Sequence, residues 1–279
     1  KERMCEEELL KIIERYDGVV AGDDEFTPMV LDAARNLRVI SKWGTGIDSI
    51  DKAHAEKIGI RVCNTPNAFS APVSDSVLAY ILCFARDVIN RDREIRAGKW
   101  SKTKCYTLEE QTLGIIGLGN CGLAVARKAS ALGMKILGND IREIPQELLE
   151  QHRVEFADKD DIYKNCDYVT LNPDLNETSR YMITERELRK MKPSAVLINT
   201  SRGPVVKNDD LARALQEGWI RGAALDVFEI EPLPADSPFR RLPNCIVSPH
   251  NSNSSYKHWD CVHTNTLKNL MDGLKYERK

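Results

Sequence analysis

The stretch LGIIGLGNCG, residues 113–122, decides the fold of this chain. Its first four residues are typical of a short apolar strand, a Gly-x-Gly-x-x-Gly pattern follows at once, and AVARK at 124–128 continues with helical character. In that order of strand, glycine-rich turn and helix, the pattern indicates a dinucleotide-binding unit. Gly117 permits a tight turn, Gly119 lets a pyrophosphate approach the backbone, and Gly122 lets the helix pack closely on the strand. The pattern predicts a cofactor site formed by Gly117, Gly119, Asn120, Cys121 and Gly122.

A carboxylate stands where the next strand of this unit should end. The strand expected at 135–139 is followed by Asp140, 18 residues beyond Gly122. An acid at this point can accept hydrogen bonds from the adenine ribose hydroxyls and repels a 2′-phosphate. The sequence therefore favours NAD over NADP, although Arg142 is close enough to weaken the preference.

Apolar strand candidates alternate with helical stretches on both sides of the motif, which predicts an α/β fold with parallel sheets. The later series predicts a doubly wound Rossmann domain over residues 69–252, and the earlier one a smaller α/β block. That block opens with a helix at 6–15 where a β-α-β unit needs a strand, so its first strand is expected to be absent. The strand candidates other than the motif itself are 18–21, 37–41, 60–63, 135–139, 168–172, 195–200, 223–227 and 245–248. The polar stretch 90–112 is expected to be a loop or arm.

Composition excludes several classes of protein. The chain has 279 residues, 42% hydrophobic and 29% charged, with a net charge of −2, which is typical of a globular protein of about two domains and not of a disordered chain. The charge balance disfavours a nucleic-acid partner, and the longest apolar run is shorter than the roughly 20 residues that a membrane helix needs. Eight scattered cysteines without metal-ligand spacing are typical of free thiols in a reducing cytoplasm, and no metal site is predicted.

Three polar residues follow the carboxyl ends of predicted strands, where open α/β sheets bind their ligands. They are Arg202, Glu231 and His250. An arginine binds a carboxylate in fork geometry and polarises a carbonyl, and a histidine donates a proton near neutral pH. A glutamate beside the histidine stabilises its protonated form. Together with a dinucleotide site, the set predicts hydride transfer to a 2-oxo acid.

With these residues in place, the sequence resembles the D-isomer-specific 2-hydroxyacid dehydrogenase family, which includes phosphoglycerate, D-lactate and glyoxylate/hydroxypyruvate enzymes. The resemblance runs from Trp43 to His250 and implies two domains. Residues 1–68 and 253–279 would form a flavodoxin-like substrate-binding domain lacking its first strand, and residues 69–252 the NAD-binding domain. The matching segments are GTGIDSID at 44–51, NTP at 64–66, the motif at 113–122, MKP at 191–193, NTSRG at 199–203, 222–232 and SPH at 248–250.

The resemblance also implies roles for individual residues. Arg202 would orient the substrate, and Glu231 would pair with His250, the acid/base of a reaction that interconverts a 2-oxo acid and a D-2-hydroxy acid. The backbone amides of Thr45 and Gly46 would hold the substrate carboxylate. Thr200 and Asp226 would join the cofactor-binding set, with Asp226 near the nicotinamide carboxamide. A homodimer through the cofactor domain is expected, with residues 90–110 as its arm.

Two questions stay open at this stage. Residues 22–25 read GDDE, and three acids would repel a substrate phosphate, so a small or polyhydroxy 2-oxo acid is favoured, unless these acids only cap the helix near Pro28. Formate is disfavoured because that branch of the family has Gln where Glu231 stands. The alternative functions are an NADH-sensing, corepressor-like binding protein and a dehydrogenase of a non-carboxylate oxyanion, for which a lysine would be expected where Thr45 stands.

Overall fold

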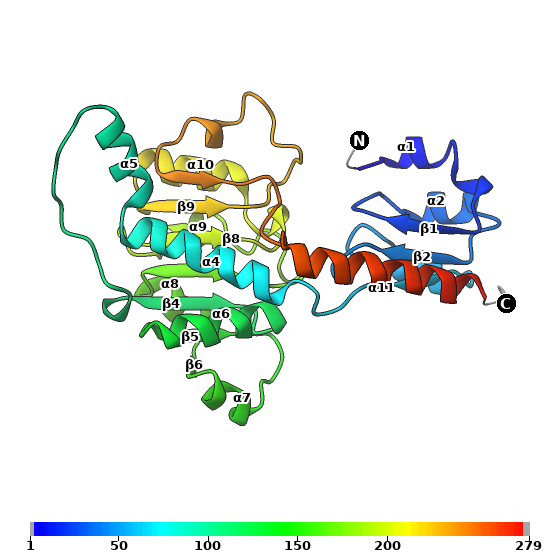
Figure 1. Cartoon of the computed structure of the whole chain (residues 1–279), viewed down its shortest axis with the longest axis horizontal. Coiled ribbons are helices and arrows are strands. Elements are labelled where there is room, and N and C mark those ends of the chain that lie inside the picture. The colour runs from blue at the N-terminus through cyan, green and yellow to red at the C-terminus, as the bar shows by residue number, and fades with distance from the viewer. Residues whose placement is uncertain (1–2, 276–279) are drawn as a thin grey trace. The chain divides into compact units, whose positions relative to one another are not determined.

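The computed structural model describes residues 3–275 and divides the chain into two compact units (Figure 1). One unit comprises the described residues up to Phe69 together with those from Ser254 onward, and the other comprises Ser70–Asn253. None of the helices in the described part combines the length and the apolar character that a membrane crossing demands.

The first unit is built on a parallel sheet of three strands in the order β1-β2-β3. The strands are β1 (Gly18–Ala21), β2 (Val39–Lys42) and β3 (Arg61–Cys63), connected through α2 (Pro28–Ala33) and α3 (Lys52–Lys57). Helix α11 (Tyr256–Leu274), from the far end of the chain, contacts all three strands. A Cβ on its Gly273 would lie 2.4 Å from the side chain of Val39, so a glycine is needed for this close packing.

The helix expected at 6–15 is shorter than predicted. Helix α1 covers only Glu6–Leu9, and a 3-10 turn, η1 (Ile13–Arg15), follows. After α1 the hydrogen bonds shorten to three-residue spacing, with the Ile12 amide donating to the Leu9 carbonyl at 3.0 Å. Leu9 and Ile13 are both buried, so the tighter turn still directs both side chains into the core.

The second unit contains a seven-stranded parallel sheet in the order β10-β9-β8-β7-β4-β5-β6. The strand order reverses between β4 and β7, which is the place where doubly wound sheets bind ligands. The strands are β4 (Thr112–Ile116), β5 (Lys135–Asn139), β6 (Val154–Phe156), β7 (Tyr168–Leu171), β8 (Val196–Asn199), β9 (Gly222–Leu225) and β10 (Cys245–Val247). Strand β6 was not predicted, because it has three residues and only Val154 is buried.

Helices cover both faces of this sheet. Adjacent residues of β8 alternate between two cores: Val196 and Ile198 pack with α4 (Ser70–Ala85) and α6 (Asn120–Ala131), and Leu197 packs with the opposite layer. That layer comprises α8 (Lys159–Asn165), α9 (Glu185–Leu188) and α10 (Asn208–Glu217). The remaining elements are α7 (Gln146–Gln151) and the 3-10 turns η2 (Leu108–Glu110), η3 (Gly203–Val205) and η4 (Pro238–Arg240).

The stretch expected to be a loop or arm begins as a helix. Helix α5 spans Val88–Arg96 and buries none of its residues, so its sequence lacks the apolar stripe that predicts a helix. Ion pairs at four-residue spacing support it instead: Arg91 lies 2.7 Å from Asp87, and Arg96 lies 2.8 Å from Asp92. Residues 99–107 continue beyond it without regular structure.

Candidate functional site

The glycine motif forms a turn between β4 and α6 that requires glycine at positions 117 and 122. Gly117 has a φ of 92°, and a Cβ there would lie 2.7 Å from the backbone of Asn172. A Cβ on Gly122 would lie 2.0 Å from the carbonyl oxygen of Gly117. A Cβ on Gly119 would meet nothing within 4 Å, so the space above this residue is open. Gly119 is also the N-cap of α6 and has no side chain to cover the helix end, where the dipole favours an anion.

Asp140 follows β5 and turns back toward the glycine motif. Its Oδ1 accepts hydrogen bonds from the amide and Nε of Arg142 at 2.9 and 3.0 Å. Its Oδ2 accepts from the Leu118 amide at 2.8 Å and from Nη2 of Arg142 at 3.0 Å. Burial disfavours the charged carboxylate, but these hydrogen bonds outweigh it and hold the pKa of Asp140 below its usual value.

Two buried polar atoms at the neighbouring strand ends lack a partner within residues 3–275. They are Oγ1 of Thr200, just after β8, and Oδ1 of Asn172, just after β7. A buried polar atom without a hydrogen bond costs about 1–3 kcal/mol, so polar groups of a ligand would stabilise both. With the open glycine turn, these atoms fit the dinucleotide predicted from the sequence. Asn172 was not among the predicted cofactor residues.

His250 and Glu231 lie together. Nδ1 of His250 is 2.9 Å from Oε2 of Glu231, and Oε1 of the same carboxylate accepts the Phe228 amide at 2.8 Å. His250 is in the left-handed region with a φ of 53°, and its amide donates to the Asp226 carbonyl at 2.7 Å. The carboxylate of Glu231 therefore orients the imidazole, and the carbonyl of Asp226, the residue after β9, holds the backbone of His250.

Asp226 has a structural contact that sequence reasoning missed. Its side chain is buried, with Oδ1 accepting the Asn251 amide at 2.9 Å and Oδ2 accepting the Ser252 amide at 2.8 Å. Both carboxylate oxygens thus hold the turn that carries His250. The sequence shows an acid near the end of the predicted strand, but the contact itself depends on the pairing of β9 with β10.

The turn that carries Arg202 lies against the same region. Asn199, buried at the end of β8, donates from Nδ2 to the Arg202 carbonyl at 2.9 Å and accepts the Ser201 amide at 3.1 Å. A Cβ on Gly203 would lie 1.9 Å from the backbone of Phe228. This contact brings the turn after β8 against the turn after β9, and with it Arg202 into the neighbourhood of the His250–Glu231 pair.

Thr45 and Gly46 belong to the first unit, in the loop after β2. This loop is tied to the residues after β3: Oγ1 of Thr45 donates to the Thr65 carbonyl at 3.0 Å, and the Thr65 amide donates to the Gly44 carbonyl at 2.9 Å. Asn64 adds a bond from Nδ2 to the Thr45 carbonyl at 2.6 Å. The loop is therefore held by hydrogen bonds to its backbone carbonyls and by the bond from Thr45 to the Thr65 carbonyl.

The acidic loop at residues 22–25 has other contacts than the capping role considered for it. It does not cap α2, because Thr27 is the N-cap and accepts the Val30 amide at 3.4 Å. Asp23 lies 2.9 Å from the ammonium group of the buried Lys42, and this pairing reduces the repulsion expected against a phosphate. Asp24 accepts the Met4 amide at 2.8 Å.

Comparison with known proteins identifies the family. Residues 78–252 match the NAD binding domain of the D-isomer specific 2-hydroxyacid dehydrogenases. The chain belongs to this family, and it is therefore an NAD-dependent oxidoreductase of the 2-hydroxyacid dehydrogenase class.

Three relatives illustrate the range of the similarity. Glyoxylate reductase of Thermofilum pendens is 38% identical over 278 residues, covering 97% of this chain and 82% of that protein. Hydroxypyruvate reductase of Thermotoga maritima is 35% identical over 255 residues, covering 89% of this chain and 82% of that protein. Among solved structures, D-lactate dehydrogenase from Aquifex aeolicus, complexed with NAD and lactic acid, has a TM-score of 0.89 at 27% identity, covering 95% of this chain and 85% of that one.

Proposed function

We propose that this protein reduces a 2-oxo acid to the D-2-hydroxy acid with NADH, with His250 as acid/base, Glu231 as its partner and Arg202 orienting the substrate. The observation that carries the proposal is the 2.9 Å contact between His250 and Glu231, in a turn that Asp226 holds at the carboxyl edge of the sheet. The Arg202 turn and the glycine motif lie at that edge of the same sheet.

Each residue has a distinct task. NAD supplies or accepts the hydride when bound. Because Glu231 engages Nδ1 of His250, proton exchange with the substrate falls to Nε2, and the carboxylate stabilises the imidazolium. The Arg202 guanidinium pairs with the substrate carboxylate and stabilises negative charge that develops on the carbonyl oxygen. The substrate-binding residues that we propose in the first unit are Thr45 and Gly46, through their backbone amides.

The cofactor would lie against the glycine turn, with its pyrophosphate at the N-terminus of α6. Asp140 would accept the adenine ribose hydroxyls, and Thr200 and Asp226 would lie toward the nicotinamide. Because both Asp226 oxygens accept backbone amides, its contribution at that end is mainly to fix the His250 turn. The full set is Gly117, Gly119, Asn120, Cys121, Gly122, Asp140, Thr200 and Asp226.

We propose a small or polyhydroxy 2-oxo acid as the substrate. Two relatives are named glyoxylate reductase and hydroxypyruvate reductase, and both names support a small 2-oxo acid as the substrate. A D-3-phosphoglycerate dehydrogenase of Methanocaldococcus jannaschii is also 37% identical over 256 residues, but this chain covers only 48% of it. Because Asp23 pairs with Lys42, the acidic loop 22–25 argues only weakly against a phosphate, and the ranking of small acids above phosphorylated ones rests mainly on the names of these relatives.

The test is NADH oxidation against glyoxylate, pyruvate, hydroxypyruvate, phosphohydroxypyruvate and 2-ketogluconate, with the His250→Ala variant in parallel. We expect turnover of a small acid and a loss of about 10²–10⁴-fold in the variant, with NADH binding unchanged. The matched control is His54→Ala, which removes a histidine 2.7 Å from a carboxylate, Asp32, in the other unit and should keep full activity. Tight NADH binding without turnover of any 2-oxo acid would favour the sensing function. Reduction of NAD⁺ by phosphite, measured in a separate assay, would favour the oxyanion dehydrogenase.

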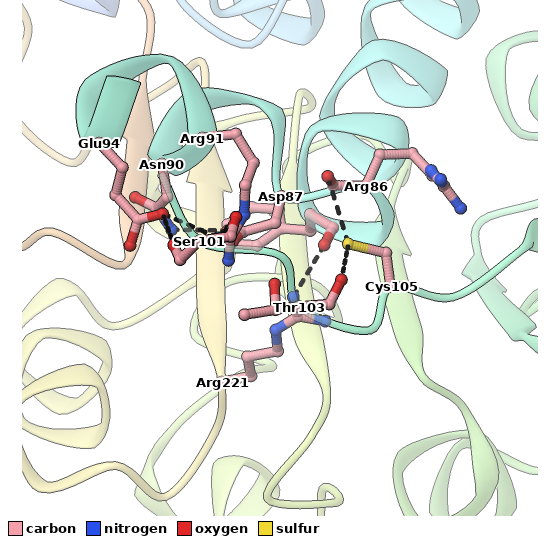
Figure 2. A network of polar contacts seen from close by, with 10 residues as sticks. Arg86, Asp87, Asn90, Arg91, Glu94, Ser101, Thr103, Cys105 and Arg221 are labelled. Atoms are coloured by element: carbon pink, nitrogen blue, oxygen red, sulfur yellow. Dashed lines mark hydrogen bonds and ion pairs between the residues drawn. The ribbon is translucent and has the colours of Figure 1, made fainter. Parts of the chain in front are cut away.

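We further propose that the protein is a homodimer through the cofactor domain. Figure 2 shows Arg91 joining α5 to the chain beyond it, with contacts to Asp87, Glu94 and Ser101. A cavity of about 250 Å³ opens beside this segment, lined in part by Phe84. Large apolar side chains are exposed along the same stretch: Leu82, Val88, Ile95, Trp100 and Tyr106.

A cytoplasmic setting is part of the same proposal. All eight cysteines are free thiols, and at least Cys166 and Cys245 have thiol pKa values raised to about 12 by burial. Thiols of this kind are inert and suit a reducing compartment.

A further inference from the structure

In the Asp140–Arg142 pair the carboxylate already accepts several hydrogen bonds. A carboxylate has about four lone-pair positions for hydrogen bonds. In Asp140 each oxygen already accepts two bonds, three of the four from Arg142 and one from the Leu118 amide. The adenine ribose of NAD therefore competes with existing donors for this carboxylate.

Of these donors, the guanidinium of Arg142 is the one that can leave. The Leu118 and Arg142 amides are fixed by the backbone, whereas the guanidinium sits on a flexible side chain that is 63% exposed, against 7% for Asp140. A ribose hydroxyl that takes the place of each guanidinium N–H keeps the buried carboxylate hydrogen-bonded, so the two side-chain bonds can be exchanged without leaving Asp140 unsatisfied. When the guanidinium leaves, one acceptor position becomes free on each carboxylate oxygen of Asp140.

A displaced Arg142 stays next to the ribose, because it is only two residues from Asp140. A guanidinium binds a phosphate through paired N–H groups. Its charge also compensates that of Asp140, so a 2′-phosphate at this place meets a neutral pair and not a lone carboxylate. Asp174 is the other acid whose charge acts on Arg142, and it partly opposes a phosphate.

We infer that Arg142 competes with the ribose of NAD for Asp140 and, once displaced, binds the 2′-phosphate of NADP, so that the site accepts both dinucleotides with a narrow preference. This inference rests on the proposed function, specifically on Asp140 as the ribose acceptor. It predicts an uncommon result: removing a cation from the site tightens the binding of an anionic ligand.

The experiment measures Kd by calorimetry for ADP-ribose and for 2′-phospho-ADP-ribose, which contain no nicotinamide and report binding without turnover. For the unmodified chain we expect two Kd values within about tenfold of each other. In Arg142→Ala, ADP-ribose should bind about two- to fivefold more tightly, and 2′-phospho-ADP-ribose about tenfold or more weakly. Arg142→Lys, which keeps the charge without the fork, should bind the 2′-phosphate with intermediate affinity.

The matched control is Arg186→Ala. Arg186 is an exposed arginine, 2.7 Å from the buried carboxylate of Glu187, outside the proposed cofactor residues. Neither Kd should change in this variant. Unchanged or weaker ADP-ribose binding in Arg142→Ala, or unchanged binding of the 2′-phosphate, would overturn the inference while leaving the dinucleotide site intact. Failure of the unmodified chain to bind ADP-ribose would overturn the proposed site as well.

Discussion

At the scale of single residues, the orientation of His250 depends on acids that play different parts. Glu231 contacts the ring and Asp226 contacts the backbone of the two residues that follow. Glu231 is itself held by the Phe228 amide, so the pair is fixed before any substrate binds. In the proposed role of acid/base, a histidine held in this way would need little reorganisation during the reaction.

Replacing Glu231 by glutamine tests its proposed part. The amide has nearly the same shape but no charge, so it stabilises the imidazolium less than the carboxylate does. In Glu231→Gln we expect kcat for reduction to fall and the Kd for NADH to stay unchanged. Because the imidazolium loses its proton more easily, the decline of the rate with rising pH should begin at a lower pH than in the unmodified chain. A pH–rate profile measured beside the unmodified chain checks this. A reduced rate with an unshifted profile would mean that Glu231 acts only through packing.

At the scale of elements, glycine occurs at positions 119 and 122 of the motif for different physical reasons. A Cβ on Gly122 would lie 2.0 Å from a backbone oxygen of the β4–α6 turn, which cannot move without opening the turn. A Cβ on Gly119 has no neighbour within 4 Å, and its φ of −75° suits any residue. Gly122 is therefore needed for the fold, whereas at position 119 the fold alone does not require glycine, and we relate that glycine to the proposed pyrophosphate.

Alanine at each position separates these reasons. Gly122→Ala should lower the free energy of unfolding by about 1–3 kcal/mol, because the added methyl overpacks a fixed contact. Gly119→Ala should leave the free energy of unfolding unchanged and weaken NADH binding, since the methyl would occupy the space proposed for the pyrophosphate. Thermal unfolding and NADH titration of the two variants check both statements. A Gly119→Ala variant that binds NADH normally would contradict the proposed position of the pyrophosphate.

The same elements show what a sequence can and cannot predict here. The strands that carry Arg202, Glu231 and His250 are apolar on both faces or flanked by clear turns, so their carboxyl ends could be found from the pattern. Strand β6 could not, because a three-residue edge strand has too few buried residues to give a period. Helix α5 could not, because ion pairs and not an apolar stripe support it. The bonds from Asp226 to residues 251 and 252 depend on the pairing of β9 with β10, which no local pattern specifies.

At the scale of the whole molecule, the two units differ in how the chain builds them. The second unit is one continuous segment and contains Arg202, Glu231, His250 and the glycine turn. The first unit needs both ends of the chain, since Oγ of Ser41 in β2 donates to the Thr266 carbonyl in α11 at 2.8 Å. Helix α5, on which we propose that two copies associate, belongs to the continuous unit.

The last prediction concerns that association. Trp100 is 84% exposed and Ile95 is 53% exposed, so covering them in an interface would remove a large apolar area from water. If a second copy covers them, charged substitutions at these positions leave a buried charge without a partner and separate the copies. We expect the unmodified chain to sediment as a dimer at micromolar concentration and the double variant Ile95→Glu/Trp100→Glu to sediment as a monomer with unchanged thermal unfolding. Met29→Glu, an equally exposed position on α2 of the other unit, serves as the control and should remain a dimer. A monomeric unmodified chain would refute the proposed homodimer and leave these side chains without an explanation.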